Sequence, residues 1–251
     1  MAAFSFFFQE RKMMKDIKGD WVVAGDLMCA PTPVPMGMLK DINAALLFSQ
    51  LTADDKYPNR RSSSEWLTEY TKALKALKWT GTGFDSQSFE VDDESVVTIA
   101  STVERLLLAG AGAEHADHVR QALACLGELP DMQAQTMFRK FTLVCPLPSE
   151  LERHASAMET DVALMITVLK PDKVVVCLWM TFTTVAQLSN DFLHQPFTGA
   201  QLKGPFVVRL SQRQWNAAGY ATVRARVERY LAGRQKDLIM PLECPDELSQ
   251  G

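Results

Sequence analysis

The feature that most constrains this fold is the stretch from Asp161 to Ala186, where two apolar runs flank a short polar turn. The runs cover residues 162–169 and 174–186, and the four residues between them read Lys-Pro-Asp-Lys. Both runs are rich in β-branched residues, the second also has aromatic residues, and neither shows a helical repeat, which favours strands that are buried on two faces. This stretch therefore predicts a long, doubly buried β-hairpin inside an α+β protein, and by itself it indicates no activity.

Composition limits the classes of partner. The chain has 251 residues, of which 47% are hydrophobic and 22% charged, values typical of a globular protein. Its net charge of −4 argues against a dedicated nucleic-acid binder, whose phosphate contacts normally give a basic balance. We expect no nucleic-acid partner. Because phosphate-binding loops and nucleophile elbows are absent from the sequence, we also expect no cofactor and lean against an enzyme.

The cysteines and the first residues bear on localisation. Five cysteines, at positions 29, 125, 145, 177 and 244, are odd in number and form no Cys-x-x-Cys pair, which predicts reduced thiols. The phenylalanines between positions 4 and 8 are followed at once by Glu10, Arg11 and Lys12, so we read no signal peptide. The expectation is a protein made in the cytoplasm in soluble form, which could act outside the cell.

Helices are expected in the first half of the chain, over residues 36–127, after strands at 4–9 and 21–28. Leucines and isoleucines at helical spacing predict a helix over 36–51. The sequence Ser62-Ser63-Ser64-Glu65 fits a capping box and predicts the start of a second helix. An acidic cluster at 92–94 precedes a third helix, and a fourth is expected over 114–126.

The second half, residues 136–210, reads as mostly strands. Apolar runs at 137–145, 162–169, 174–185 and 206–210 predict the sheet. Ser211-Gln212-Arg213-Gln214 matches another capping box and predicts a long amphipathic C-terminal helix over 211–232. We expect one α+β domain over 1–251, with a largely antiparallel sheet covered by amphipathic helices.

The charge pattern of the C-terminal region is distinctive. Residues 201–240 carry eight basic side chains and only two acidic ones, Glu228 and Asp237, although the whole chain is acidic. A basic amphipathic helix can bind anionic lipid head groups or an acidic protein surface. A solvated arginine face on an ordinary packed helix is the alternative. The residues expected to contact a membrane or a partner are Arg213, Trp215, Arg224, Arg226 and Arg229.

The apolar hairpin admits two interpretations. It can be the core of a sheet covered by helices, or, if those helices move away, it can supply an apolar surface for insertion into a bilayer. The base rate for apolar strands favours the core. The residues that would form the insertion surface are Val174, Val176, Leu178, Trp179 and Phe182.

Two histidines give a third lead. His115 and His118 are three residues apart in an expected helix, so their imidazoles share a face and could bind one metal ion. The His-Glu-x-x-His motif of zinc proteases is absent, and a complete site needs further ligands. A solvated polar helix face is the simpler interpretation.

The order of these elements resembles the cytolytic, Cyt-type pore-forming toxins. The resemblance rests on helices first, a helix pair over 95–126, and then apolar strands at 137–145, 162–169 and 174–185. It implies a single domain in which helices wrap a sheet, and membrane insertion after the two layers separate. Residues 66–79 and the basic final helix have no counterpart in that pattern, so no residue roles are carried over.

Three functions therefore remain. The first is a non-enzymatic, bacterial-type protein that binds a membrane or an acidic partner, with toxin-like pore formation as its extended form. The second is a structural or assembly protein that forms a homo-oligomer through an exposed sheet edge or the segment bearing Trp215. The third is a metal-dependent enzyme around His115 and His118.

Overall fold

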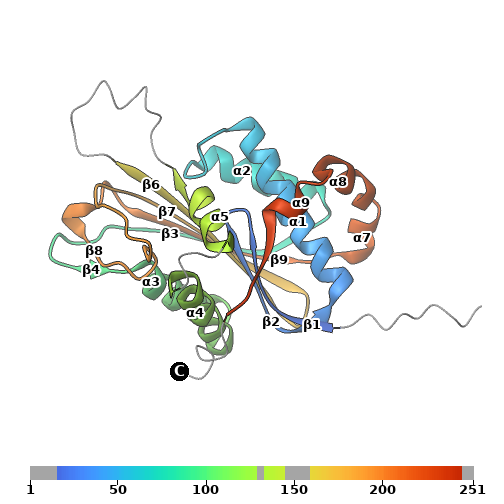
Figure 1. Ribbon diagram of the computed structural model, residues 1–251, viewed down its shortest axis with the longest axis horizontal. Helices are drawn as coiled ribbons and strands as arrows, with labels where there is room; N and C mark the ends of the chain where they lie inside the picture. The colour runs from blue at the N-terminus through green and yellow to red at the C-terminus, as the bar shows by residue number, and fades with distance from the viewer. Residues whose placement is uncertain (1–15, 129–132, 145–158, 245–251) are drawn as a thin grey trace, which may run out of the picture.

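The computed structural model describes residues 16–128, 133–144 and 159–244, and shows one mixed sheet between two helical layers (Figure 1). The strands are β1 (Asp16–Val23), β2 (Asp26–Pro35), β3 (Thr80–Phe89), β4 (Val96–Val97), β5 (Leu143–Val144), β6 (Thr160–Leu169), β7 (Val174–Thr184), β8 (Phe197–Thr198), β9 (Phe206–Gln214) and β10 (Ile239–Leu242). The helices are α1 (Met36–Lys56), α2 (Ser64–Ala76), α3 (Ile99–Gly110), α4 (Ala113–Glu128), α5 (Gln133–Thr142), α7 (Ala217–Ala221), α8 (Arg224–Leu231) and α9 (Gln235–Leu238), with a short 3₁₀ turn η1 (Gly199–Gln201). The expected α+β class is confirmed.

The main sheet has the strand order β10-β1-β2-β6-β7-β9-β3, and β5 pairs with β6 off this path. Its pairs are antiparallel except for β2 with β6, which are parallel. The expected hairpin is confirmed as β6 and β7, whose register runs from Thr160 opposite Thr184 to Leu169 opposite Val175. This hairpin lies in the middle of the sheet, so both of its outer edges are already paired.

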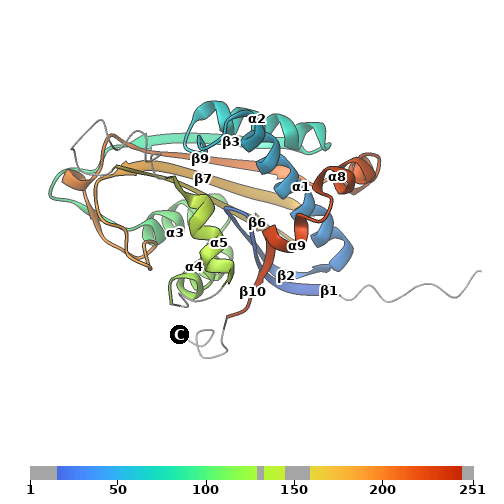
Figure 2. The same cartoon turned by 45° about the horizontal axis from the view of Figure 1, so that its top comes forward.

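Helices cover both faces of the sheet. Figure 2 shows α1, α2 and α8 on one side of the strands and α3, α4 and α5 on the other. Residues alternate along β7 between the two layers: Val176, Leu178 and Met180 pack with α3 and α4, while Cys177 and Trp179 pack with α1 and α2. The alternation explains the unbroken apolar run, since a strand covered on both faces has no polar side.

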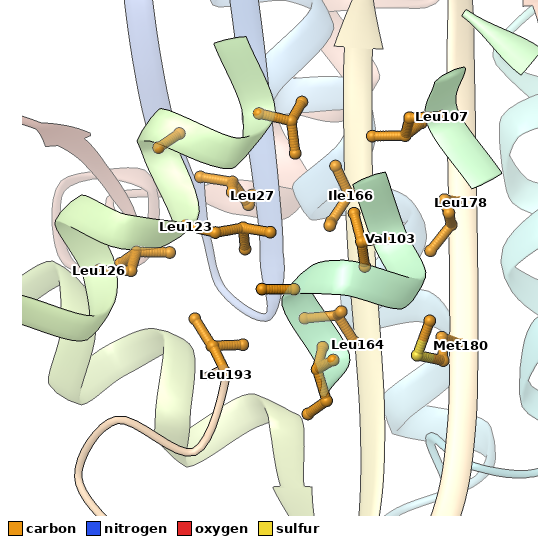
Figure 3. Packing of buried hydrophobic residues seen from close by; sticks show 14 of the residues in the cluster. Leu27, Val103, Leu107, Leu123, Leu126, Leu164, Ile166, Leu178, Met180 and Leu193 are labelled. Atoms are coloured by element: carbon orange, nitrogen blue, oxygen red, sulfur yellow. The ribbon is translucent and has the colours of Figure 1, made fainter. Parts of the chain in front are cut away.

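Figure 3 shows the layer beneath α3 and α4 from close by. Val103 and Leu107 of α3 lie over the strand residues Ile166 and Leu178. Leu123 of α4 lies beside Leu27 of β2, and all six residues are buried. At about 25 cal/mol per Å² of apolar area, such contacts are the main force holding this layer to the sheet.

Several expected elements need correction. Residues 137–145 were expected to form a strand, but Gln133–Thr142 is helix α5, whose buried residues Ala134, Met137 and Phe138 follow helical spacing. The expected strand at 21–28 is divided by a turn at Ala24 and Gly25 into β1 and β2. Residues 80–89, where no strand was expected, form β3. The expected strand at 4–9 lies outside the described residues.

The C-terminal helix is also different from the expectation. Residues 211–214 continue strand β9, which pairs with both β7 and β3 as far as Gln214. The helix expected over 211–232 is instead two short helices, α7 and α8, which follow that strand. The capping pattern at 211–214 was misleading because two neighbouring strands hold this segment in the sheet. Where the chain is described, no helix combines the length and the apolar character that a membrane crossing requires.

Candidate functional site

The hairpin residues expected to insert into a membrane lie in the interior. Val176 and Leu178 are fully buried, Trp179 and Phe182 are 4% exposed, and Val174 at the turn is partly buried. The indole of Trp179 also donates a hydrogen bond of 3.3 Å to the backbone oxygen of Arg61. In this conformation Val176, Leu178, Trp179 and Phe182 are core residues out of reach of a bilayer, and Val174 alone of the five is partly exposed, at the turn.

Two of the expected contact residues are buried as well. Arg213 lies in β9, is 9% exposed, and donates a hydrogen bond of 3.4 Å to the hydroxyl of Thr71. Trp215 follows the strand and packs against Trp79 and Tyr220, with ring centroids 5.3 and 4.8 Å apart. Neither side chain is therefore part of an accessible contact surface, and Trp215 does not offer an exposed docking anchor.

The remaining three arginines lie together on α8. Arg226 and Arg229 are exposed on the face opposite the buried residues Val227 and Leu231. Among the described residues neither arginine takes part in an ion pair. Arg224 is different, because its guanidinium donates two hydrogen bonds, of 2.9 and 2.6 Å, to the carboxylate of Asp41 on α1. This bidentate pair fixes α8 against α1.

A groove of about 490 Å³ runs beside the Arg224–Asp41 pair. Five elements and the segments next to them form its walls: β1, α1, the α7–α8 segment, α9 and β10. Its volume falls in the range typical of small-molecule sites. The lining residues are Ile17, Trp21, Met36, Leu39, Lys40, Asp41, Asn43, Ala44, Tyr220, Arg224, Glu228, Gln235, Lys236, Ile239 and Pro241. We call this feature the α1–α8 groove.

Two residues that line the α1–α8 groove each carry a buried polar atom without a partner among the described residues. The hydroxyl of Tyr220 and the side-chain oxygen of Asn43 have no hydrogen-bond partner among the described residues, and these residues are 0% and 4% exposed. Burial, reinforced by the nearby carboxylate of Asp41, raises the pKa of Tyr220, so its hydroxyl stays protonated. An unpartnered buried polar atom costs about 1–3 kcal/mol, and a bound molecule with matching groups would recover that energy.

The two histidines do not form a common metal site. His118 Nε2 lies 2.8 Å from Asp20 Oδ1 on β1, and the two residues form a compact group with Cys29 of β2. His115 is not part of this group, and its Nε2 is buried without a partner in the described parts of the chain. Sequence reasoning found His118 but not Asp20 or Cys29, because the three are brought together only by the packing of α4 on β1 and β2.

The expectation of reduced thiols is wrong for one pair of cysteines. Cys125 of α4 and Cys244 after β10 form a disulfide with a Cα–Cα distance of 5.6 Å, which is normal for such a bond. Cys29 and Cys177 are free and buried, and Cys145 lies outside the described residues. The disulfide ties α4 to the edge of the sheet.

The α1–α8 groove was not predicted from the sequence. The arginines of α8 were found through their charge, but the groove also needs β1, α1 and β10, which are distant in the chain. The excess of basic residues over 201–240 is the one sequence pattern that indicates part of the groove, and it indicates only the wall formed by α8.

Comparisons with known proteins add likenesses of fold at low similarity. No protein-family model and no curated protein matches the chain. The activated Cyt2Ba monomer from Bacillus thuringiensis subsp. israelensis is 14% identical, with a TM-score of 0.45 over 77% of this chain and 98% of that one. A delta-endotoxin structure is 12% identical, with a TM-score of 0.42 over 76% of this chain and 83% of that one.

A third solved structure, that of the Evf virulence factor, is 8% identical, with a TM-score of 0.35 over 85% of both chains. The chain is thus similar to these three solved structures at low identity and low TM-score. At these TM-scores the likeness carries no information about activity.

Proposed function

We propose that this protein binds anionic membrane surfaces, with α8 meeting the head groups and the α1–α8 groove receiving part of one lipid. The observation that carries the proposal is the pair of unsatisfied buried groups, Tyr220 and Asn43, in a groove bordered by a basic helix. The occupant is an amphiphile with an apolar body and an anionic head that carries hydroxyl groups.

The walls of the α1–α8 groove offer apolar surface to the apolar part of the occupant. Ile17, Leu39 and Ile239 bring aliphatic surface from three elements, and the partly exposed Trp21 adds a ring. A ligand covering these side chains would gain about 25 cal/mol per Å² of apolar area removed from water.

The hydrogen-bonding groups of Tyr220 and Asn43 determine the polar part of the occupant. The Tyr220 hydroxyl can donate to a phosphate or carboxylate oxygen, whereas the Asn43 oxygen accepts and so needs a donor such as a lipid hydroxyl. Lys40 and Lys236 border the same groove and would favour a negatively charged head, while Arg224 is already paired with Asp41. A purely apolar ligand would leave both buried groups unsatisfied.

Exposed basic side chains on α8 and α9 would attract the protein to an anionic bilayer. Arg226 and Arg229 are spaced i, i+3 on α8 and so share a face, and Lys236 of α9 is also exposed. Each such residue near an anionic leaflet contributes about 1 kcal/mol, and the contribution falls as salt is raised. Glu228 on the same helix opposes them, which makes the contact weak and reversible.

Co-sedimentation with phosphatidylglycerol vesicles, beside phosphatidylcholine vesicles and at two salt concentrations, tests the surface contact. We expect salt-sensitive binding to the anionic vesicles, lost in the double variant Arg226→Glu, Arg229→Glu. The matched control, Lys75→Glu with Lys203→Glu, reverses two exposed charges on other elements and should keep most of the binding. Equal binding by both double variants would refute the role of α8.

The groove is tested separately by tryptophan fluorescence. Of the five tryptophans, Trp66, Trp79, Trp179 and Trp215 are buried, and Trp21 alone lines the groove. Anionic lipid should change the emission of the wild type, and Trp21→Phe should abolish most of that change while vesicle binding persists. Tyr220→Phe should weaken the response to lipid without altering the fold. An unchanged response in Trp21→Phe would contradict occupation of the groove.

Pore formation through the hairpin is a further step of the same proposal. Because β6 and β7 are central and covered on both faces, insertion requires a helical layer to leave the sheet first. Binding without release of an entrapped dye would support surface binding alone. Dye release that requires the charges of α8 would support the toxin-like mechanism.

A second candidate function is homo-oligomer assembly through β3. This ten-residue strand is at one end of the strand order, pairs with β9 on one side, and has no second strand partner among the described residues. Ser86 and Ser88 are exposed along it, and an open edge without lysine or proline is a site where another copy can pair.

Light scattering after gel filtration, without lipid, tests this alternative. A dimer that becomes a monomer in Ser86→Lys with Ser88→Lys would favour assembly through β3. The control places the same two lysines at the exposed positions Ser95 and Ala218. A wild-type monomer at all concentrations would remove the alternative.

A further inference from the structure

Three side chains of different chemistry converge between the sheet and α4. They are the carboxylate of Asp20 on β1, the thiol of Cys29 on β2 and the imidazole of His118 on α4. One donor atom from each lies within 4.8 Å of the other two. The shortest of these separations is the 2.8 Å between His118 Nε2 and Asp20 Oδ1.

The fold holds this group in place from three directions. Asp20 and Cys29 are direct cross-strand partners in the antiparallel pair of β1 and β2. Side chains of directly opposed residues stand on the same face of a sheet, about 4.5–5.5 Å apart at Cβ. Helix α4 packs on this face through Val119 and Leu123, which sets His118 over the two strand residues.

We propose that Asp20, Cys29 and His118 bind a divalent metal ion of borderline softness, with Zn²⁺ as the preferred occupant. Sulfur, imidazole nitrogen and carboxylate oxygen are the donor types of protein zinc sites, and three protein ligands leave a fourth position for water or another molecule. The side chains of His118 and Asp20 are 17% and 12% exposed, which gives the ion a path from solvent. The proposal is independent of lipid binding.

The charges of the group fit a dication. A thiolate and a carboxylate together balance the two positive charges of Zn²⁺, and a neutral imidazole adds the third donor. Cys29 also packs in the core beneath α4, and its thiol donates a hydrogen bond to the side chain of Asp20, so the sulfur lies beside the other two donors.

A nucleophilic cysteine is the other chemistry that these three residue types suggest. Cys29 is 0% exposed, beneath α4, so a substrate carbonyl cannot reach its sulfur. An ion that enters past the partly exposed Asp20 and His118 would lie beside the sulfur, because one donor atom from each of the three residues lies within 4.8 Å of the other two. Burial thus favours a metal ligand over a catalytic thiol.

Metal binding by the full chain tests the proposal, with the Cys125–Cys244 disulfide kept intact by omitting thiol reductants. After dialysis against a chelator, the protein is titrated with Zn²⁺ and counted by native mass spectrometry, and Co²⁺ is used as a spectroscopic substitute. We expect one ion per chain and, with Co²⁺, a thiolate-to-metal charge-transfer band.

The variants use controls from the same helix and the same residue type. Loss of an outer-shell partner alone costs about 10- to 100-fold in metal affinity, so Cys29→Ala and His118→Ala should weaken binding by more than about 100-fold. His115→Ala, one turn away on α4, and Cys177→Ala, the other free cysteine among the described residues, should bind as the wild type does. Asp20→Asn keeps the shape of the group and removes only the charged ligand.

Three results would overturn the proposal. They are a wild type that binds no stoichiometric Zn²⁺, a cobalt complex without the charge-transfer band, and equal affinity in Cys29→Ala, His118→Ala and the two controls. The first two use only the wild type, so they decide the matter even if a ligand variant fails to fold.

Discussion

The hydroxyl of Thr167 donates a 2.7 Å hydrogen bond to the carboxylate of Asp26, at a place where both residues are fully buried. Asp26 is the first residue of β2, and Thr167 lies on the neighbouring strand β6. The second carboxylate oxygen has no partner among the described residues. Burial raises the pKa of Asp26 from 3.8 to about 7, while the bond from Thr167 and the charge of Arg61 act in the opposite direction.

Because of this buried carboxyl, we expect the free energy of unfolding to fall as pH rises. Between about pH 4 and pH 7 the folded protein holds a proton on Asp26 that the unfolded chain has lost, so stability declines through that interval and levels off above it. Asp26→Asn cannot ionise, and at pH 8 it should exceed the wild type by as much as about 4 kcal/mol, the equivalent of roughly three pKa units.

Urea unfolding at pH 5 and pH 8 measures the effect of Asp26→Asn. The exposed Asp93→Asn is the control and should follow the wild type at both pH values. If the pH dependence of Asp26→Asn were parallel to that of the wild type, Asp26 would not be the group responsible.

The elements that could be predicted from the sequence are those whose pattern of apolar residues follows directly from how the element is buried. The hairpin of β6 and β7 was clear because burial on two faces leaves an unbroken apolar run. The pair α3 and α4 was clear because each helix buries one stripe. Helix α2 begins within the predicted segment 62–65 but one residue later than the capping box implied, since Ser63 is the N-cap and its hydroxyl accepts a hydrogen bond from the Trp66 amide.

The elements that were missed depend on distant partners. Strand β3 contains Gly81, Gly83 and two serines, and it is held mainly by its ladder to β9, with Phe89 stacked on Phe206 at one end. Helix α5 was taken for a strand because its aromatic and threonine residues have high β propensity, although its buried residues recur at helical spacing. The α1–α8 groove and the group around His118 require tertiary contacts that no local pattern contains.

Arg61 predicts a large effect on stability. Its side chain is 7% exposed and donates hydrogen bonds of 2.9 Å to Asp54 and to the side-chain oxygen of Gln50. Arg61→Ala leaves both acceptors without this partner, and we expect a loss of about 2–4 kcal/mol in unfolding free energy. The neighbouring Arg60 is exposed, and Arg60→Ala should cost less than about 0.5 kcal/mol. Chemical denaturation of the two variants, side by side, gives the comparison; equal losses would mean that the buried network does not stabilise the protein.

The disulfide between Cys125 and Cys244 predicts sensitivity to reductant. It joins positions 119 residues apart, and closing a long loop in the unfolded chain typically adds about 2–4 kcal/mol of stability. A thiol reductant should therefore lower the unfolding midpoint of the wild type. Cys244→Ser should be less stable from the start and should not respond to the reductant. A midpoint that shifts equally in both proteins would assign the effect to some other group.

The backbone packed against Gly199 leaves no room for a side chain at this position. Gly199 opens the turn η1 after β8, and a Cβ there would come within 2.5 Å of the backbone oxygen of Asp92 and also contact the backbone oxygen of Val91. Because backbone atoms cannot turn aside as a flexible side chain can, Gly199→Ala should cost at least about 1–3 kcal/mol. Gly81 in β3 has nothing within 4 Å of the same atom, so Gly81→Ala should be neutral or slightly stabilising. Thermal unfolding should separate the two variants by several degrees, since 1 kcal/mol corresponds to about 2–4 °C in a chain of this size. Similar melting temperatures would show that the loop before β4 moves to make room, and that its close packing on Gly199 contributes little to stability.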